Sequence, residues 1–134
     1  MHDKITGAAL PSVQALSYLG DAVHSLFVRR ALIERGHCKS GELNVLAQKF
    51  VSAEAQAEIM RKIKPHLLPD ELDVYRRASN STHLNRPRHA SAADYRAASG
   101  FEAVVGMLEW IADGERLEEL LKIAMEDMEN DTED

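Results

Sequence analysis

The chain has 134 residues, of which 45% are hydrophobic and 28% charged, a composition typical of one folded domain and not of a disordered chain. No apolar run approaches the roughly 18 residues of a membrane span, so we expect no membrane association. The single cysteine, Cys38, excludes an internal disulfide and favours a reducing compartment, the cytoplasm. The net charge of −6 is uneven, because residues 113–134 carry −8 and the remainder +2. Five arginines and one acid lie within residues 76–96, so a basic segment precedes an acidic end.

Apolar residues recur at helical spacing along the chain, and no alternating β-branched runs indicate strands. The pattern predicts six helices: residues 12–35, a short helix after Ser40, Ser52 to about Ile63, one opening at Pro69, Ser91 to Ala112, and one whose apolar stripe runs from Leu117 to Met128. Residues 79–90 form the longest expected loop, and residues from about 129 onward are expected to fray. The sequence therefore predicts an all-α single domain with a folded core of about residues 12–128.

The first predicted helix is apolar nearly all round, which is typical of a central or interface helix. Its main apolar stripe is expected to consist of Leu16, Leu19, Val23, Leu26 and Phe27. Asp21 lies on the other side of that helix, and a carboxylate on a largely buried helix needs a partner or a metal.

A second acid, Glu102, lies on the helix expected to follow Ser91. It falls beside the apolar stripe that contains Phe101, and the small residues Ser99 and Gly106 would let another helix or a ligand approach closely. Either acid alone is more simply a surface or capped carboxylate. Two such acids on two central helices weaken that simpler interpretation without overturning it.

The segments around these acids, Leu19-Gly20-Asp21-Ala22-Val23 and residues 100–106 (Gly-Phe-Glu-Ala-Val-Val-Gly), resemble the two signature segments of the ribonuclease III catalytic domain. Between them, residues 51–57 (Val-Ser-Ala-Glu-Ala-Gln-Ala) with Arg77, Asn80, Pro87 and Tyr95-Arg96 resemble the Mini-ribonuclease III branch of that superfamily. The resemblance extends from about Ser12 to Ala124 and leaves room for three helices between the signature segments.

This resemblance implies an all-helical homodimer that hydrolyses double-stranded RNA with magnesium, manganese being a substitute. The implied substrate is a stem in the precursor of large-subunit (23S) ribosomal RNA, and a ribosomal protein or a ribosome precursor is a further implied partner. Asp21 and Glu102 match the family's catalytic, metal-binding carboxylates. We expect no separate double-stranded-RNA-binding domain.

Larger ribonuclease III enzymes have acids at the positions of Gln14, Ser17 and Ser99, so two obvious carboxylates remain per site. Ser17 and Ser99 are therefore candidates for the surroundings of the metal. Magnesium commonly takes one or two carboxylates together with waters and a substrate phosphate, so Asp21 and Glu102 on facing helices would suffice. The metal would stabilise charge on the phosphate and activate water as the nucleophile. His24, one turn after Asp21, suits zinc better than magnesium.

The basic segment is the expected RNA contact, because A-form duplexes are recognised by shape, phosphates and 2′-hydroxyls. The candidate RNA-binding residues are Arg76, Arg77, Asn80, His83, Arg86, Arg88, His89 and Arg96. A solvated loop whose arginines only keep the protein soluble is the alternative.

Taken together, these features favour a magnesium-dependent endoribonuclease that acts as a homodimer in ribosomal RNA maturation. The first helix has more apolar surface than so short a chain can cover, and a two-fold partner would bury the rest. Two alternatives remain: an RNA-binding module that keeps the fold without catalysis, and a helical dimerisation or adaptor protein with no RNA role.

Overall fold

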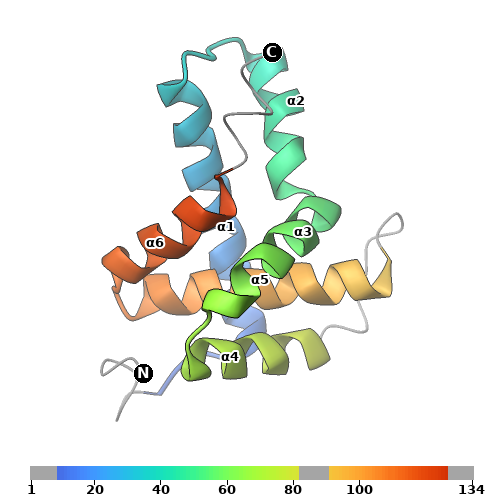
Figure 1. Ribbon diagram of the computed structural model, residues 1–134, viewed down its shortest axis with the longest axis vertical. Coiled ribbons are helices and arrows are strands. Elements are labelled where there is room, and N and C mark those ends of the chain that lie inside the picture. The colour runs from blue at the N-terminus through green and yellow to red at the C-terminus, as the bar shows by residue number, and fades with distance from the viewer. Residues whose placement is uncertain (1–8, 82–90, 127–134) are drawn as a thin grey trace.

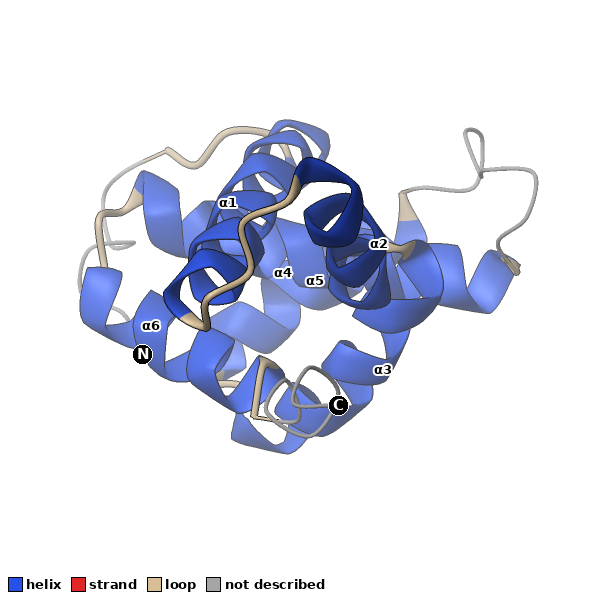
Figure 2. Cartoon of the chain, turned by 90° about the horizontal axis from the view of Figure 1, so that it is seen from above, coloured by secondary structure: helices blue, strands red, loops and turns tan. Residues whose placement is uncertain are grey.

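The computed structural model describes residues 9–81 and 91–126, and within these ranges every regular element is a helix (Figure 1, Figure 2). The elements are α1 (Val13–Glu34), α2 (Ser40–Val51), α3 (Ala53–Ile63), the 3₁₀ turn η2 (Lys64–His66), α4 (Pro69–Asn80), α5 (Ala92–Trp110) and α6 (Gly114–Ala124). The predicted all-α class is confirmed. Among the described helices, none is both long and apolar enough to cross a membrane.

Serine side chains cap three of these helices at their N-termini, as the sequence predicts. The hydroxyls of Ser12, Ser52 and Ser91 accept hydrogen bonds from backbone N–H groups three residues later, at 3.1, 3.2 and 3.0 Å. Each satisfies a backbone donor that the first turn leaves without a partner, and such a cap contributes about 1 kcal/mol. Local sequence therefore determines where these helices begin.

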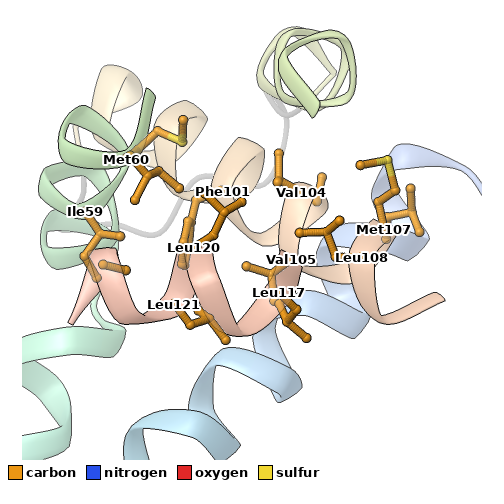
Figure 3. Close-up of a cluster of buried hydrophobic side chains, with 14 of the residues drawn as sticks. Ile59, Met60, Phe101, Val104, Val105, Met107, Leu108, Leu117, Leu120 and Leu121 are labelled. Carbon is orange, nitrogen blue, oxygen red and sulfur yellow. The ribbon is translucent and has the colours of Figure 1, made fainter. Parts of the chain in front are cut away.

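Helix α5 is the centre of the fold, and α1, α3, α4 and α6 all pack against it. In Figure 1 it runs across the middle of the molecule, with α4 along one side. Its residues 98–108 are buried except for Glu102, which is half-buried. Figure 3 shows Phe101 and Val105 of α5 in one apolar cluster with Leu117 and Leu120 of α6. A polar side chain on this helix therefore lies next to the core.

Helix α1 buries a different face from the predicted one. The buried positions are Leu16, Gly20, His24, Val28 and Leu32, spaced four residues apart. The predicted stripe is only partly correct, because Leu26 is 59% exposed and Leu19, Val23 and Phe27 are half-buried. The sequence pattern favoured bulky apolar residues, whereas the close approach of α5 requires a small residue, Gly20. Asp21 consequently flanks the buried row and does not lie opposite the core.

Two helix boundaries also differ from the expectation. Helix α4 continues through Asn80, so the segment that lacks apolar periodicity begins inside a helix. Helix α5 ends at Trp110, Ala112 takes the left-handed conformation with φ 59°, and Gly114 begins α6. Asp113 caps α6 by accepting a hydrogen bond from the Arg116 backbone at 3.2 Å. Met128 and the rest of residues 127–134 lie outside the described residues.

Candidate active site

Helices α1 and α5 cross with their backbones in contact, at Gly20 and Gly106. A Cβ atom on Gly20 would overlap the backbone oxygen of Glu102, and one on Gly106 would overlap the backbone oxygen of Leu16. Only glycine allows this approach. Because Asp21 directly follows Gly20 and Glu102 lies one turn before Gly106, the crossing brings the two acids together.

The two carboxylates lie within hydrogen-bonding reach of one another in this arrangement. Asp21 is exposed, whereas Glu102 is half-buried. Burial, followed by the hydrogen bond and the negative charge of Asp21, raises the pKa of Glu102 to about 8, although a hydrogen bond from Gln56 acts in the opposite direction. Two such close carboxylates repel when both are ionised, so a bound cation would stabilise the doubly ionised pair.

The donors present at this crossing fit a hard divalent cation. Both acids offer oxygen ligands, and the exposure of Asp21 leaves the pair open to solvent and substrate. No group of three or more histidine, cysteine, aspartate or glutamate side chains that could hold a metal lies in residues 9–81 and 91–126. A pair of carboxylates suits magnesium, which retains several waters and takes substrate phosphate as a further ligand.

Gln56 is a site residue that the sequence analysis did not single out. Its side chain is only 2% exposed, and its Nε2 donates a hydrogen bond to Oε2 of Glu102 at 3.5 Å. One signal was available in the sequence. Gln56 begins the buried row of α3, which continues with Ile59, Met60 and Ile63, so a polar residue lies at a core position.

His24 is fully buried and links α1 to α2 and α5 near the two carboxylates. Its Nε2 donates to the backbone oxygen of Phe50 at 2.8 Å, and its ring meets that of Phe101 edge-on, with centroids 4.9 Å apart. Burial lowers the pKa of His24, which keeps the ring neutral, and Nδ1 has no hydrogen-bond partner. His24 does not form a group of three potential metal ligands with Asp21 and Glu102.

Ser17 and Ser99 link α1 and α5 one turn before the two acids. The hydroxyl of Ser17 donates to the backbone oxygen of Ser99 at 2.8 Å. The resemblance described above implies acids at these two positions in larger ribonuclease III enzymes. Here a neutral hydrogen bond between the helices occupies that place, and a role of either serine toward a metal stays a prediction.

The described part of the basic segment lies at the end of α4 and the start of α5. Arg76, Arg77, Asn80 and Arg96 are all exposed. The hydroxyl of Ser79 donates to the backbone oxygen of Arg96 at 3.1 Å, so the last turn of α4 lies beside the first turns of α5.

This α4–α5 contact continues to Gly100, which packs against the ring of Tyr75 and the hydroxyl of Ser79. The last turn of α4 therefore reaches α5 two residues before Glu102. Four further candidates, His83, Arg86, Arg88 and His89, lie outside the described residues.

Comparisons with known proteins identify the family of this chain. Residues 14–109 match the ribonuclease III domain family. A Mini-ribonuclease 3 of Symbiobacterium thermophilum is 42% identical over 85% of this chain and 88% of that protein, and one of Streptococcus pneumoniae is 37% identical over 86% and 91%. A crystal structure of a Fusobacterium nucleatum protein has a TM-score of 0.78 at 26% identity, over 85% of this chain and 87% of that one. The chain therefore belongs to the ribonuclease III family, within its Mini-ribonuclease 3 group, and is an endoribonuclease.

Proposed function

We propose that this endoribonuclease cleaves double-stranded RNA with a divalent metal held by Asp21 and Glu102, and that a stem of the 23S ribosomal RNA precursor is its substrate. The observation that carries the proposal is the contact between these two carboxylates at the Gly20–Gly106 crossing. Magnesium is the proposed metal, with manganese as a substitute, because both acids offer hard oxygen ligands.

Asp21 and Glu102 would hold the metal at this site. A bound divalent metal would supply a Lewis acid that stabilises charge on the scissile phosphate and would make water a stronger nucleophile. Glu102 would have to be ionised to act as a ligand, and its pKa of about 8 means that it would give up a proton to hold the metal near neutral pH. Asp21, being exposed, would meet the metal and the RNA backbone together. No serine, cysteine or histidine nucleophile is needed.

The basic residues would hold the RNA beside this pair. Arg76, Arg77, Asn80 and Arg96 form an exposed polar group at the α4–α5 contact. We propose that they bind phosphates and 2′-hydroxyls together with His83, Arg86, Arg88 and His89. Each phosphate contact would steepen the dependence of log affinity on log salt concentration by about 0.7–0.9.

A homodimer is part of the proposal. Three large apolar side chains of α1, Tyr18, Leu26 and Ile33, are 84%, 59% and 59% exposed on the side away from α5. Leu26 also lines a cavity of about 500 Å³ between α1 and α6, together with Val23 and Phe27. A second copy would cover this apolar face, and two sites related by a two-fold axis would address both strands of a duplex.

The direct test is RNA cleavage by Asp21→Asn and Glu102→Gln. Purified protein is incubated with a pre-rRNA stem and magnesium, manganese or a chelator, and products are resolved on a gel. We expect discrete cuts that need the metal, and a loss of cleavage rate of at least about 100-fold in each variant. Replacing a metal ligand should lower activity at least as much as replacing a residue that orients a ligand. Glu115→Gln, an exposed acid on α6 that does not line the cavity between α1 and α6, is the matched control and should cleave normally.

Three other results would contradict the proposal. Cleavage by both variants at the wild-type rate would show that the two carboxylates are not needed for the reaction. Tight RNA binding without cuts under any divalent metal would support a catalytically inactive RNA-binding module. Absence of both binding and cleavage would favour a dimerisation or adaptor role.

A further inference from the structure

Gln56 is the polar member of an otherwise apolar buried row on α3. Its neighbours in the buried row of α3, Ala57, Ile59, Met60 and Ile63, are apolar. A buried amide lowers stability unless it is hydrogen-bonded, so the position is better explained by what the amide contacts than by packing. That contact is with Oε2 of Glu102, at 3.5 Å.

The backbone of Gln56 is held in place from two sides. Its N–H donates to the backbone oxygen of Ser52 at 2.9 Å, within the capped first turn of α3. The chain two residues before Ser52 is tied to α1, because His24 donates to the backbone oxygen of Phe50 in the last turn of α2. Helix α3 also packs on α5. Gln56 therefore projects from a support that is fixed relative to both carboxylate-bearing helices.

The crossing fixes the backbones of the two acids, whereas the position of the Glu102 carboxylate also depends on the contacts of its side chain. A glutamate has three rotatable bonds, and each has more than one preferred value. Among the described residues, the amide of Gln56 donates to Glu102 without adding a charge to a site where Asp21 already repels it. A neutral donor can orient a carboxylate that a third acid would only destabilise.

We propose that Gln56 is a positioning residue, whose amide N–H holds Oε2 of Glu102 so that Glu102 and Asp21 point at one divalent cation. The inference rests on the proposed function, in which these two acids hold the metal. Gln56, on α3, would be a neutral third residue of the site beside the two carboxylates. Gln56 orients a ligand and does not itself touch the reacting atoms.

The test measures manganese binding to metal-free protein by isothermal titration calorimetry, without RNA. Gln56→Met replaces the amide with an unbranched side chain of similar volume and should weaken manganese binding by roughly 10–100-fold, the usual effect of removing a group that orients a ligand. Met60→Leu, one turn later in the same buried row, is the packing control and should bind manganese as the wild type does.

Three further measurements separate positioning from folding. Thermal melting and RNA binding in chelator should be unchanged in Gln56→Met, whereas the manganese concentration for half-maximal cleavage should rise. Gln56→Asn keeps the amide but is too short to reach Glu102, so it should also weaken metal binding. It serves as the second variant if the methionine variant does not fold.

The outcomes distinguish this inference from the proposed function. If Asp21→Asn and Glu102→Gln abolish manganese binding while both Gln56 variants bind within about threefold of Met60→Leu, only the positioning role is overturned. If Glu102→Gln binds manganese and cleaves RNA like the wild type, the proposed function fails and the inference falls with it. Weak metal binding by both folded Gln56 variants, with unchanged RNA binding, supports the inference.

Discussion

At Glu102, the stability of the metal-free fold and metal binding require different protonation states of the same carboxyl group. The folded protein raises its pKa to about 8, first by burial and then through Asp21. The neutral acid therefore dominates near pH 7 in the metal-free protein, while a metal ligand must be ionised. The fold thus holds the Glu102 side chain in an environment that disfavours its ionised form. A bound cation would favour the ionised form instead.

This opposition predicts how metal-free stability depends on pH. Because the folded pKa of about 8 lies above the ordinary 4.5, the folded state binds more protons than the unfolded state between these values. The free energy of unfolding should therefore fall as the pH rises from about 5 to about 8 and become level above the folded pKa.

Glu102→Gln should lack this component of the pH dependence. Thermal melting in chelator at about pH 5.5 and pH 8.5 checks the prediction, since the wild type should lose more stability than the variant between the two conditions. Equal losses in the two proteins would contradict the raised pKa.

At the scale of elements, the α1–α5 crossing is the contact on which the site depends. Any side chain at Gly106 would meet the backbone of Leu16, which cannot rotate away as a side chain could. Gly106→Ala should therefore force the helices apart and cost at least about 3 kcal/mol in the free energy of unfolding, the upper range for overpacking.

Gly41→Ala is the matched control for that substitution. Gly41 lies in the first turn of α2, and a Cβ atom there meets nothing within 4 Å. Its replacement should leave stability unchanged or raise it by up to about 1 kcal/mol, because alanine favours helix. Chemical denaturation of both variants checks the pair, and equal effects would show that the crossing tolerates a side chain.

A buried ion pair joins α4 to α6 on another side of α5. Both oxygens of Glu71 accept hydrogen bonds from Arg116, each at 2.8 Å, and Glu71 is fully buried. The same guanidinium donates to the backbone oxygen of His66 at 2.6 Å, and Glu71 also accepts from the backbone N–H of Leu68. The pair therefore fixes the loop before α4 as well as the two helices.

Arg116→Met should destabilise the protein by about 3–5 kcal/mol, because it leaves the buried carboxylate of Glu71 without its counter-charge. Lys122→Met on the same helix removes an exposed pair with Glu118 and should change stability by less than about 1 kcal/mol. Urea denaturation compares the two variants. A loss in Arg116→Met no larger than in Lys122→Met would show that the buried pair contributes little.

At the scale of the whole molecule, the proposed dimer makes the apolar face of α1 an interface. Leu26 is exposed on that face and lines the cavity between α1 and α6. Leu26→Glu would place a charge in the interface, so we expect a dimeric wild type and a monomeric variant in light-scattering mass measurements.

Val45→Glu is the control, because Val45 is 67% exposed on α2 and does not line that cavity. This variant should remain dimeric. A wild type that is monomeric at all concentrations, or a Leu26→Glu variant that stays dimeric, would contradict the proposed interface.

Local sequence determined the helices and the identity of the candidate carboxylates. The capping serines Ser12, Ser52 and Ser91 and the apolar spacing act within a few residues, so the starts of three helices and the all-α class could be predicted. The segments around Asp21 and Glu102 were likewise readable as motifs, and their resemblance to a known family implied that the two acids share one site. Helix ends were less predictable, since Ala112 and not a glycine takes the left-handed conformation after α5.

Only the tertiary structure decided which faces meet. The face of α1 from Leu16 to Leu32 packs toward the core because Gly20 is small enough to let α5 approach. The spacing of apolar residues does not reveal this, since glycine does not contribute to a hydrophobic stripe. Gln56 joins the carboxylate pair because α3 packs on α5, a contact between residues 46 positions apart in the sequence. The raised pKa of Glu102 follows from the same packing, since burial and the nearness of Asp21 exist only after the helices have crossed.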